Sequence, residues 1–157
     1  MTIQEKKIMK INQSQTAFIL GVTFVVLGIL GFAPSLLSIP PVGFESDIPL
    51  DPNIFPYAQG FGNIFGLFPT NLMHNLVRLT VGLFGIAASG NYFSARSFNR
   101  YFAVAYILLA LMGFIPFAKT MFGLMPLFGN NVWFNALVAV IAGYFGFIKS
   151  DVPTAKV

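Results

Sequence analysis

Four apolar stretches of about 18 residues each constrain this chain more than any other feature of its sequence. They run over residues 16–33, 71–89, 98–115 and 131–148. A helix that crosses the hydrocarbon core of a membrane needs roughly 20 mostly apolar residues. Charged residues make up only 9% of the chain, which is too few to cover a surface that faces water. The sequence therefore predicts an all-α membrane protein with four transmembrane helices, and it excludes a soluble globular domain.

Proline and asparagine mark the ends of these stretches. Pro34 and Pro116 follow the first and third stretches, where the missing N–H and the fixed φ of proline stop a helix. Asn71 and Asn131 begin the second and fourth stretches, as residues that cap a helix do. Residues 1–15 and 149–157 then form tails on a membrane domain of residues 16–148, and residues 34–70 form a long loop.

The basic residues predict the orientation in the membrane. The two tails and the turn between the second and third helices hold seven of the nine Lys and Arg residues, whereas the two other loops hold one, Lys119. Because cytoplasmic segments are enriched in Lys and Arg, we expect both termini to be cytoplasmic and the 34–70 loop to lie outside. No basic groove with stacking aromatics accompanies the net charge of +4, so we expect no nucleic-acid partner.

The chain repeats a helix–loop–helix unit. An L-G-F-A-P ending at residue 34 matches an M-G-F-I-P ending at residue 116, and F-G-L-F-P at residues 65–69 matches F-G-L-M-P at 122–126. Each unit crosses the membrane twice, so the two units are predicted to be parallel repeats. We expect the F-G-L-x-P elements to be short interfacial or shallow re-entrant segments. The 34–70 loop contains seven of the ten prolines, and it could be an ordered cap over the bundle or a docking surface for a partner subunit.

Six polar residues form the polar constellation of the predicted membrane region. They are Asn71, His74, Asn75, Arg78, Asn131 and Asn135. An arginine at the centre of a membrane costs at least about 2.5 kcal/mol, so Arg78 is a functional candidate by default. We expect its side chain to reach lipid phosphate, an acid of the outer loop (Glu45, Asp47 or Asp51) or an anionic ligand held between the repeats. If the protein has a ligand-binding site, we expect it at these six residues.

His74 is the only histidine, and the chain has no cysteine. We expect its imidazole to hydrogen-bond a loop carbonyl, Asn131 or Asn135. A structural metal site needs about four suitable ligands, so no metal is expected. A chlorophyll needs a single axial ligand, and His74 could supply it in a photosynthetic source; otherwise no cofactor is expected. The predicted helices contain no carboxylate for acid–base chemistry and no phosphate-binding glycine motif, so we do not expect an enzyme.

Small residues four positions apart favour close packing of helices, as in the pairs Gly85 and Ser89, Ala139 and Gly143, and Ala142 and Gly146. They could pack within the bundle, against a second copy or against a membrane-protein partner. The sequence thus favours a small accessory or structural protein of the lipid bilayer, such as a subunit or assembly partner of a larger membrane complex. The alternative is a binder or carrier of a small anionic ligand or lipid near the outer leaflet.

One motif points to a family. The run F-G-L-F-P-T-N-L-M-H-N-L-V at residues 65–77, with G-x-x-G later in the same helix, resembles the signature of small four-span bacterial membrane proteins catalogued only as a domain of unknown function. The resemblance covers about residues 21–146. It implies the four-helix fold and the inner membrane of a bacterium (an actinobacterium or a cyanobacterium, in the latter case with the thylakoid as an alternative), and it implies no activity. Relatives often carry a second histidine or a glycine where this chain has Arg78, and histidine where it has Asn135, which speaks against a role that needs two histidines.

Overall fold

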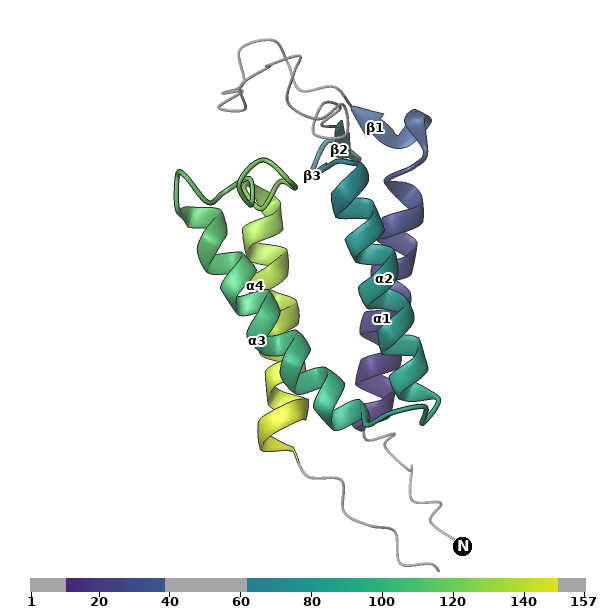
Figure 1. Cartoon of the computed structure of the whole chain (residues 1–157). Coiled ribbons are helices and arrows are strands. Elements are labelled where there is room, and N and C mark those ends of the chain that lie inside the picture. The colour runs from purple at the N-terminus through teal and green to yellow at the C-terminus, as the bar shows by residue number, and fades with distance from the viewer. Residues whose placement is uncertain (1–10, 39–61, 150–157) are drawn as a thin grey trace, which may run out of the picture.

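The structure is a computed structural model that describes residues 11–38 and 62–149. Its main elements are four helices: α1 (Gln13–Leu30), α2 (Leu72–Ser89), α3 (Ala95–Phe114) and α4 (Asn130–Gly143), the last continued by a wider π-helical turn, Tyr144–Ile148. Together they form an elongated bundle (Figure 1). All four are long and apolar enough to cross a membrane. The prediction of an all-α membrane protein with four transmembrane helices is confirmed.

Helices α1 and α3 begin three residues earlier than the apolar stretches do, because polar residues cap them. Asn12 starts α1 through a capping box: its side chain accepts a hydrogen bond from the Gln15 N–H at 2.8 Å, and the Gln15 side chain accepts one from the Asn12 N–H at 3.0 Å. Ser94 starts α3 by accepting from the Ser97 N–H at 3.2 Å. Helix α1 ends at Leu30, and the chain then enters a single 3₁₀ turn, Pro34–Leu36. The predicted first and third helices, which start at residues 16 and 98, therefore start three residues too late.

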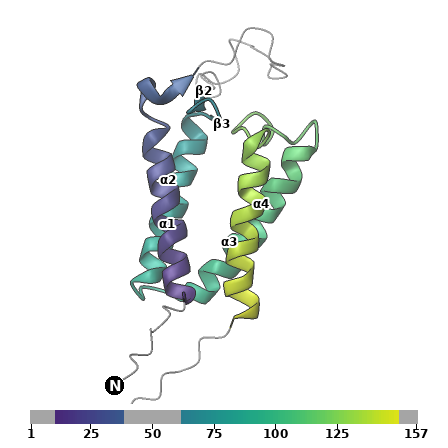
Figure 2. The ribbon, with the colours of Figure 1, turned by 180° about the vertical axis from the view of Figure 1, so that it is seen from behind.

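The helices pack as two pairs, α1 with α2 and α3 with α4 (Figures 1 and 2). In the first pair the two backbones touch. A Cβ atom added to Gly21 would lie 2.7 Å from the Gly82 carbonyl oxygen, and one added to Gly85 would lie 2.8 Å from the Ala17 carbonyl oxygen. Only glycine allows this approach, which is the use that membrane helices make of small residues.

A layer of aromatic rings joins the two pairs. The Phe24 ring of α1 meets the rings of Phe102 and Tyr106 of α3 edge-on, with centroids 5.3 and 5.0 Å apart. The rings of Phe102 and Tyr106 stack at 4.1 Å, and Phe134 of α4 lies 5.6 Å from Phe24. Small and branched residues of all four helices complete this core. The outer faces of the helices carry large exposed apolar side chains, as contact with lipid requires.

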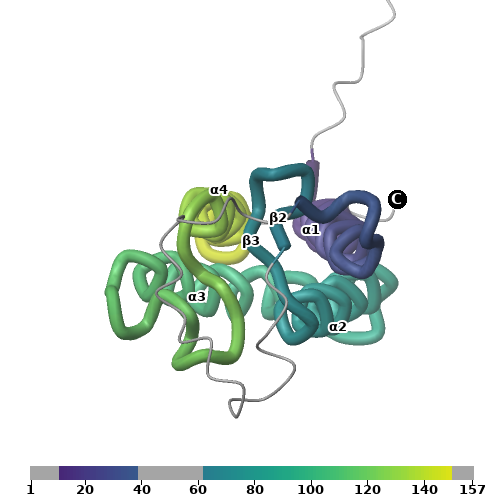
Figure 3. The backbone as a smooth tube through the Cα atoms, turned by 90° about the horizontal axis from the view of Figure 1, so that it is seen from above, coloured from purple at the N-terminus to yellow at the C-terminus, as the bar shows by residue number. Residues whose placement is uncertain are grey.

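We call the end of the bundle with the sheet the loop end and the opposite end, where α1 and α3 begin, the tail end. The small antiparallel sheet has the order β1 (Leu37–Ser38), β2 (Gly62–Ile64) and β3 (Phe68–Thr70), with Ser38 opposite Asn63 and Asn63 opposite Pro69. Seen from this end, β2 and β3 lie between the two helix pairs (Figure 3). The sequence predicted interfacial or re-entrant segments here and no strand. The rest of the 34–70 loop, with its three acids, lies outside the described residues, so its role as a cap or a docking surface stays a prediction.

The two F-G-L-x-P elements form similar tight turns, although Met121 before the second is also left-handed and Ile64 before the first is in strand β2. In each, the Phe and the Gly have left-handed backbone conformations, with φ of 53° and 72° at Phe65 and Gly66 and of 57° and 90° at Phe122 and Gly123. In each, the following Leu N–H closes the turn on a carbonyl three residues earlier, at 3.0 Å in the first element and 3.3 Å in the second. Four apolar side chains of these turns are more than half exposed: Phe65, Leu67, Phe122 and Leu124.

Candidate functional site

The candidate site lies at the loop end, where α2 and α4 both begin. Asn71 caps α2: its Oδ1 atom accepts a hydrogen bond from the His74 N–H at 2.8 Å. The same side chain uses Nδ2 to donate to the Leu124 carbonyl oxygen at 2.8 Å, in the segment that leads into α4. One asparagine therefore starts the second helix and also ties it to the second helix pair.

Arg78 lies deeper in α2, and its side chain is 1% exposed. Its two terminal nitrogens donate to neutral oxygens, Nη1 to Thr70 Oγ1 at 3.2 Å and Nη2 to Asn131 Oδ1 at 3.1 Å. The guanidinium therefore bridges strand β3 and helix α4. A buried charge without a charged partner is unfavourable, so these bonds offset only part of the cost of its burial.

Asn131 is the central acceptor and donor of the site. While its Oδ1 atom accepts from Arg78, its Nδ2 atom donates to the carbonyl oxygens of Pro69 at 2.7 Å and Pro126 at 3.0 Å. Proline carbonyls in the two loops thus receive their hydrogen bonds from one side chain. The second F-G-L-x-P element and strand β3 are held together by this contact.

Thr70 and Asn75 extend the same network to α1. The Thr70 hydroxyl donates to Asn75 Oδ1 at 2.5 Å, and Asn75 Nδ2 donates to the Gly31 carbonyl oxygen at 2.8 Å. The hydrogen bonds therefore run from the end of α1 through Asn75, Thr70, Arg78 and Asn131 to the loop before α4. Sequence analysis did not include Thr70 among the site residues, although its position directly before the capping Asn71 was a usable signal.

Three buried polar atoms at this end have no hydrogen-bond partner among the described residues: His74 Nδ1, Arg78 Nε and Asn135 Nδ2. The Pro69 carbonyl interacts with the His74 ring, which agrees with the loop-carbonyl partner expected for this imidazole. Asn135 is buried one turn after Asn131 on the same face of α4. The structure thus places all six sequence-predicted residues in the interior of the loop half of the bundle, and two of their free atoms are N–H donors.

The partners expected for Arg78 can now be compared with its surroundings. The side chain is buried in the protein and does not extend to lipid phosphate. Glu45, Asp47 and Asp51 lie outside the described residues, and residues 11–38 and 62–149 contain no Asp or Glu. No group of three metal-ligating His, Cys, Asp or Glu side chains exists in those ranges. The site is therefore a cationic, donor-rich interior built on asparagine and backbone carbonyls.

A second polar network, which sequence analysis missed, lies at the tail end. Asn99 of α3 is fully buried and donates from Nδ2 to the Gln13 carbonyl oxygen at 3.0 Å. The Gln13 side chain in turn donates from Nε2 to the Lys149 carbonyl oxygen at 2.7 Å. These contacts join the start of α1, the first turns of α3 and the end of the fourth helix. The signal available in the sequence was the position of two polar residues, Gln13 and Asn99, near the starts of the first and third helices.

Comparison with known proteins identifies the family. A family model described as "Domain of unknown function (DUF4383)" matches residues 14–148, which include every polar residue of the candidate site and all four helices apart from the first residue of α1. No curated protein and no solved structure matches the chain. The family of unknown function that the motif at residues 65–77 suggested is confirmed. The chain therefore belongs to the DUF4383 family.

Proposed function

We propose that this protein is a small, non-enzymatic component of a larger membrane complex, with an accessory or structural role. The observation that supports this proposal is the use of the polar side chains at the loop end. Asn71, Asn75 and Asn131 all donate to backbone carbonyls of the protein itself. Side chains bound in this way hold loops and helix ends in place and are poorly suited to proton transfer, which needs a group that is free to gain or lose a proton.

The surface at the loop end supports an accessory role as well. The two F-G-L-x-P turns present Phe65, Leu67, Phe122 and Leu124 with more than half of each side chain exposed, and Phe117 is still more exposed. Exposed aromatic side chains at the end of a helix bundle sit at the membrane interface or contact a partner subunit. A rigid turn that carries such side chains is well suited to hold a neighbouring membrane protein.

The proposal also covers the orientation of the protein in the membrane and its internal repeat. We propose that the protein lies in a bacterial inner membrane or a cyanobacterial thylakoid, with both termini in the cytoplasm. The starts of α1 and α3 and the ends of α2 and the fourth helix lie at one end of the bundle (Figure 1), and most Lys and Arg residues belong to the segments at this end. The pairing of the helices and the shared turn geometry support two parallel repeats.

Purification from native membranes in a mild detergent tests this function. We expect the tagged protein to co-purify with a larger membrane complex at a constant ratio. A variant in which Phe65 and Phe122 are both changed to Ser should lose the partner while keeping its own fold, and Leu83→Ser, on the exposed face of α2, is the control. Recovery of the wild-type protein alone in several mild detergents would contradict the proposal.

The absorption spectrum of the same sample tests whether His74 is the axial ligand of a bound chlorophyll.

A second function, the binding of a small anionic ligand or lipid headgroup at the loop end, is favoured by one observation. Arg78 is buried without a carboxylate partner in the described part of the chain, and both Arg78 Nε and Asn135 Nδ2 are unpartnered N–H donors. A bound anion would compensate the charge and use these donors.

Thermal unfolding in detergent tests this second function, because a ligand that binds the folded state raises its melting temperature. We expect chloride or phosphate to stabilise the wild-type protein relative to a bulky organic anion, and to have no such effect on Arg78→Met. Changing Glu45, Asp47 and Asp51 to their amides distinguishes the two possible partners of Arg78, a bound anion and an acid of the loop. If this variant lost stability and the anions had no effect on the wild type, a loop acid would be the partner and anion binding would be rejected.

A further inference from the structure

Two arginines at the tail end share one backbone acceptor. Arg96 Nε and Arg100 Nε, one turn apart on α3, donate to the Gly146 carbonyl oxygen at 3.2 and 2.8 Å. Their Nε atoms are therefore closer to each other than the sum of these two distances. Gly146 makes the arrangement possible, because a Cβ atom at this position would lie 2.9 Å from the Arg100 backbone nitrogen. The wide turn that ends the fourth helix supplies the carbonyl.

No described residue neutralises this pair of charges. Each guanidinium uses its Nε atom for the Gly146 carbonyl, and neither makes a further hydrogen bond within residues 11–38 and 62–149. Those ranges contain no carboxylate. Arg100 is exposed and Arg96 is half-buried, so their terminal N–H groups are accessible. Two guanidinium groups fixed side by side with free N–H groups match the geometry of a phosphate, which arginine binds through paired hydrogen bonds.

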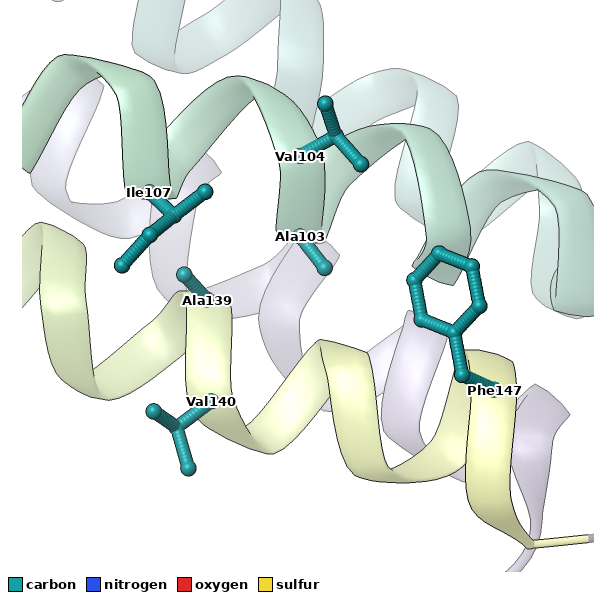
Figure 4. A pocket seen from close by; sticks show the side chains of 6 residues that line it. All are labelled: Ala103, Val104, Ile107, Ala139, Val140 and Phe147. Atoms are coloured by element: carbon teal, nitrogen blue, oxygen red, sulfur yellow. The ribbon is translucent and has the colours of Figure 1, made fainter.

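An apolar groove starts at the same place. The Arg100 guanidinium lies over the ring of Phe147, with its central carbon 5.4 Å from the ring centroid. Phe147 lines a groove of about 240 Å³ between α3 and α4, together with Ala103, Val104, Ile107, Ala139 and Val140 (Figure 4). From Ala103 to Ile107 the groove follows α3 for about 6 Å, at 1.5 Å per residue, and Arg100 stands about one turn before it. This length and the absence of polar side chains fit a segment of one acyl chain.

We propose that the tail end of α3 and α4 binds one anionic phospholipid. Its phosphate contacts the terminal N–H groups of Arg96 and Arg100, and one of its acyl chains lies in the groove between the two helices. The arginines stand in the first two turns of α3, at the depth where lipid headgroups meet a transmembrane helix. A zwitterionic lipid carries the same phosphate together with a cationic group that the two arginines repel, so the site prefers an anionic headgroup. This inference is independent of the function proposed above, because it uses the opposite end of the bundle.

The test uses the full-length protein, purified in detergent and exchanged with vesicles that contain phosphatidylglycerol or phosphatidylcholine of equal chain length. Native mass spectrometry then counts the lipids that each protein retains. One basic residue near an anionic lipid surface changes affinity about fivefold, so two should give a preference of about thirtyfold for phosphatidylglycerol. Equal retention of the two lipids by the wild-type protein would overturn the proposal.

Variants separate the two halves of the site. Changing both Arg96 and Arg100 to Gln should remove the preference for phosphatidylglycerol, whereas Lys119→Gln, which removes one positive charge at the loop end, should leave it unchanged. Val104→Trp, at a half-exposed position that lines the groove, obstructs the groove without changing the arginines or the buried core, and it should lower the retention of phosphatidylglycerol. This variant keeps the test decisive if the double Gln variant fails to fold. Unchanged retention in Val104→Trp, or full displacement of the lipid by inorganic phosphate, would reject the acyl-chain part of the site.

Discussion

Arg78 and Asn131 provide the sharpest test of how the two helix pairs are joined. Their hydrogen bond, 3.1 Å from Nη2 to Oδ1, is a direct side-chain contact between α2 and α4. A hydrogen bond to a charged group contributes about 1.5–3 kcal/mol. A single Arg78→Met change measures this bond poorly, because it also relieves the burial of a charge that costs at least about 2.5 kcal/mol in a membrane. The two effects oppose each other, so the net change in the free energy of unfolding can be small.

A double-mutant cycle isolates the bond. Asn131→Leu removes the bond to Arg78 and also the two bonds to the carbonyls of Pro69 and Pro126, but the latter cancel when Asn131→Leu is measured with and without Arg78→Met. We expect a coupling energy of about 1.5–3 kcal/mol. Equilibrium unfolding by SDS in detergent micelles gives the four free energies. Trp133, the only tryptophan, packs edge-on to Phe114 at 5.7 Å and reports on the loop end by its fluorescence.

The control pair is Arg78→Met with Asn99→Leu. Asn99 is as deeply buried as Asn131, but it belongs to the tail-end network, where it donates to Gln13. Changes without shared partners usually add to within about 0.5 kcal/mol, so this cycle should show no coupling. A coupling energy below about 0.5 kcal/mol for Arg78 and Asn131 would refute the idea that their contact joins the two helix pairs.

Three further predictions concern the contact between α1 and α2, the Thr70 hydroxyl and the orientation in the membrane. Gly21→Ala should destabilise the protein by about 1–3 kcal/mol, because the new Cβ atom would lie 2.7 Å from the backbone of α2. The control Gly143→Ala should be tolerated, because its Cβ atom would meet one methyl group at 3.6 Å. Equal unfolding free energies of the two variants would contradict this prediction. Thr70→Val should cost about 1–3 kcal/mol because it removes a hydroxyl that bonds two side chains, and Thr70→Ser should recover most of the loss in the same unfolding assay. A cysteine placed at Ser46 should react with a membrane-impermeant thiol reagent in intact cells while cysteines in either tail stay unlabelled; the opposite pattern would reverse the proposed topology.

The length of the apolar runs made the fold predictable from sequence. The capping residues limited how accurately the helix starts could be predicted. A run of 18 apolar residues has few alternatives to a membrane helix, so all four were found. Asn12 and Ser94 are polar and precede the apolar runs, yet they set where α1 and α3 begin. Strands of two or three residues have no periodic pattern to detect, and the small sheet was therefore missed.

The residues of the candidate site were predictable for a different reason. A polar side chain in a membrane helix almost always faces the protein interior, so the position of the asparagines and Arg78 in apolar runs favoured burial, although a reach to lipid phosphate was an alternative for Arg78. Their partners were not predictable, because the Pro69, Pro126 and Gly31 carbonyls reach them only through the folding of the loops. At the tail end, Arg96 and Arg100 served in the sequence only as signs of orientation, since nothing in their spacing indicates that one carbonyl of the fourth helix binds both.

The glycine contacts described above determine how this bundle can move. Because Gly21 and Gly82 bring α1 and α2 into backbone contact near their midpoints, neither helix can slide or rotate against the other without a steric clash. The second pair is in close contact at its ends instead, through Gly113 against the Leu127 carbonyl and Gly146 against the Arg100 backbone. Each pair therefore behaves as a stiff body. We therefore expect any large-scale motion in the described bundle to occur between the pairs, and to require breaking the hydrogen bonds that join them at both ends.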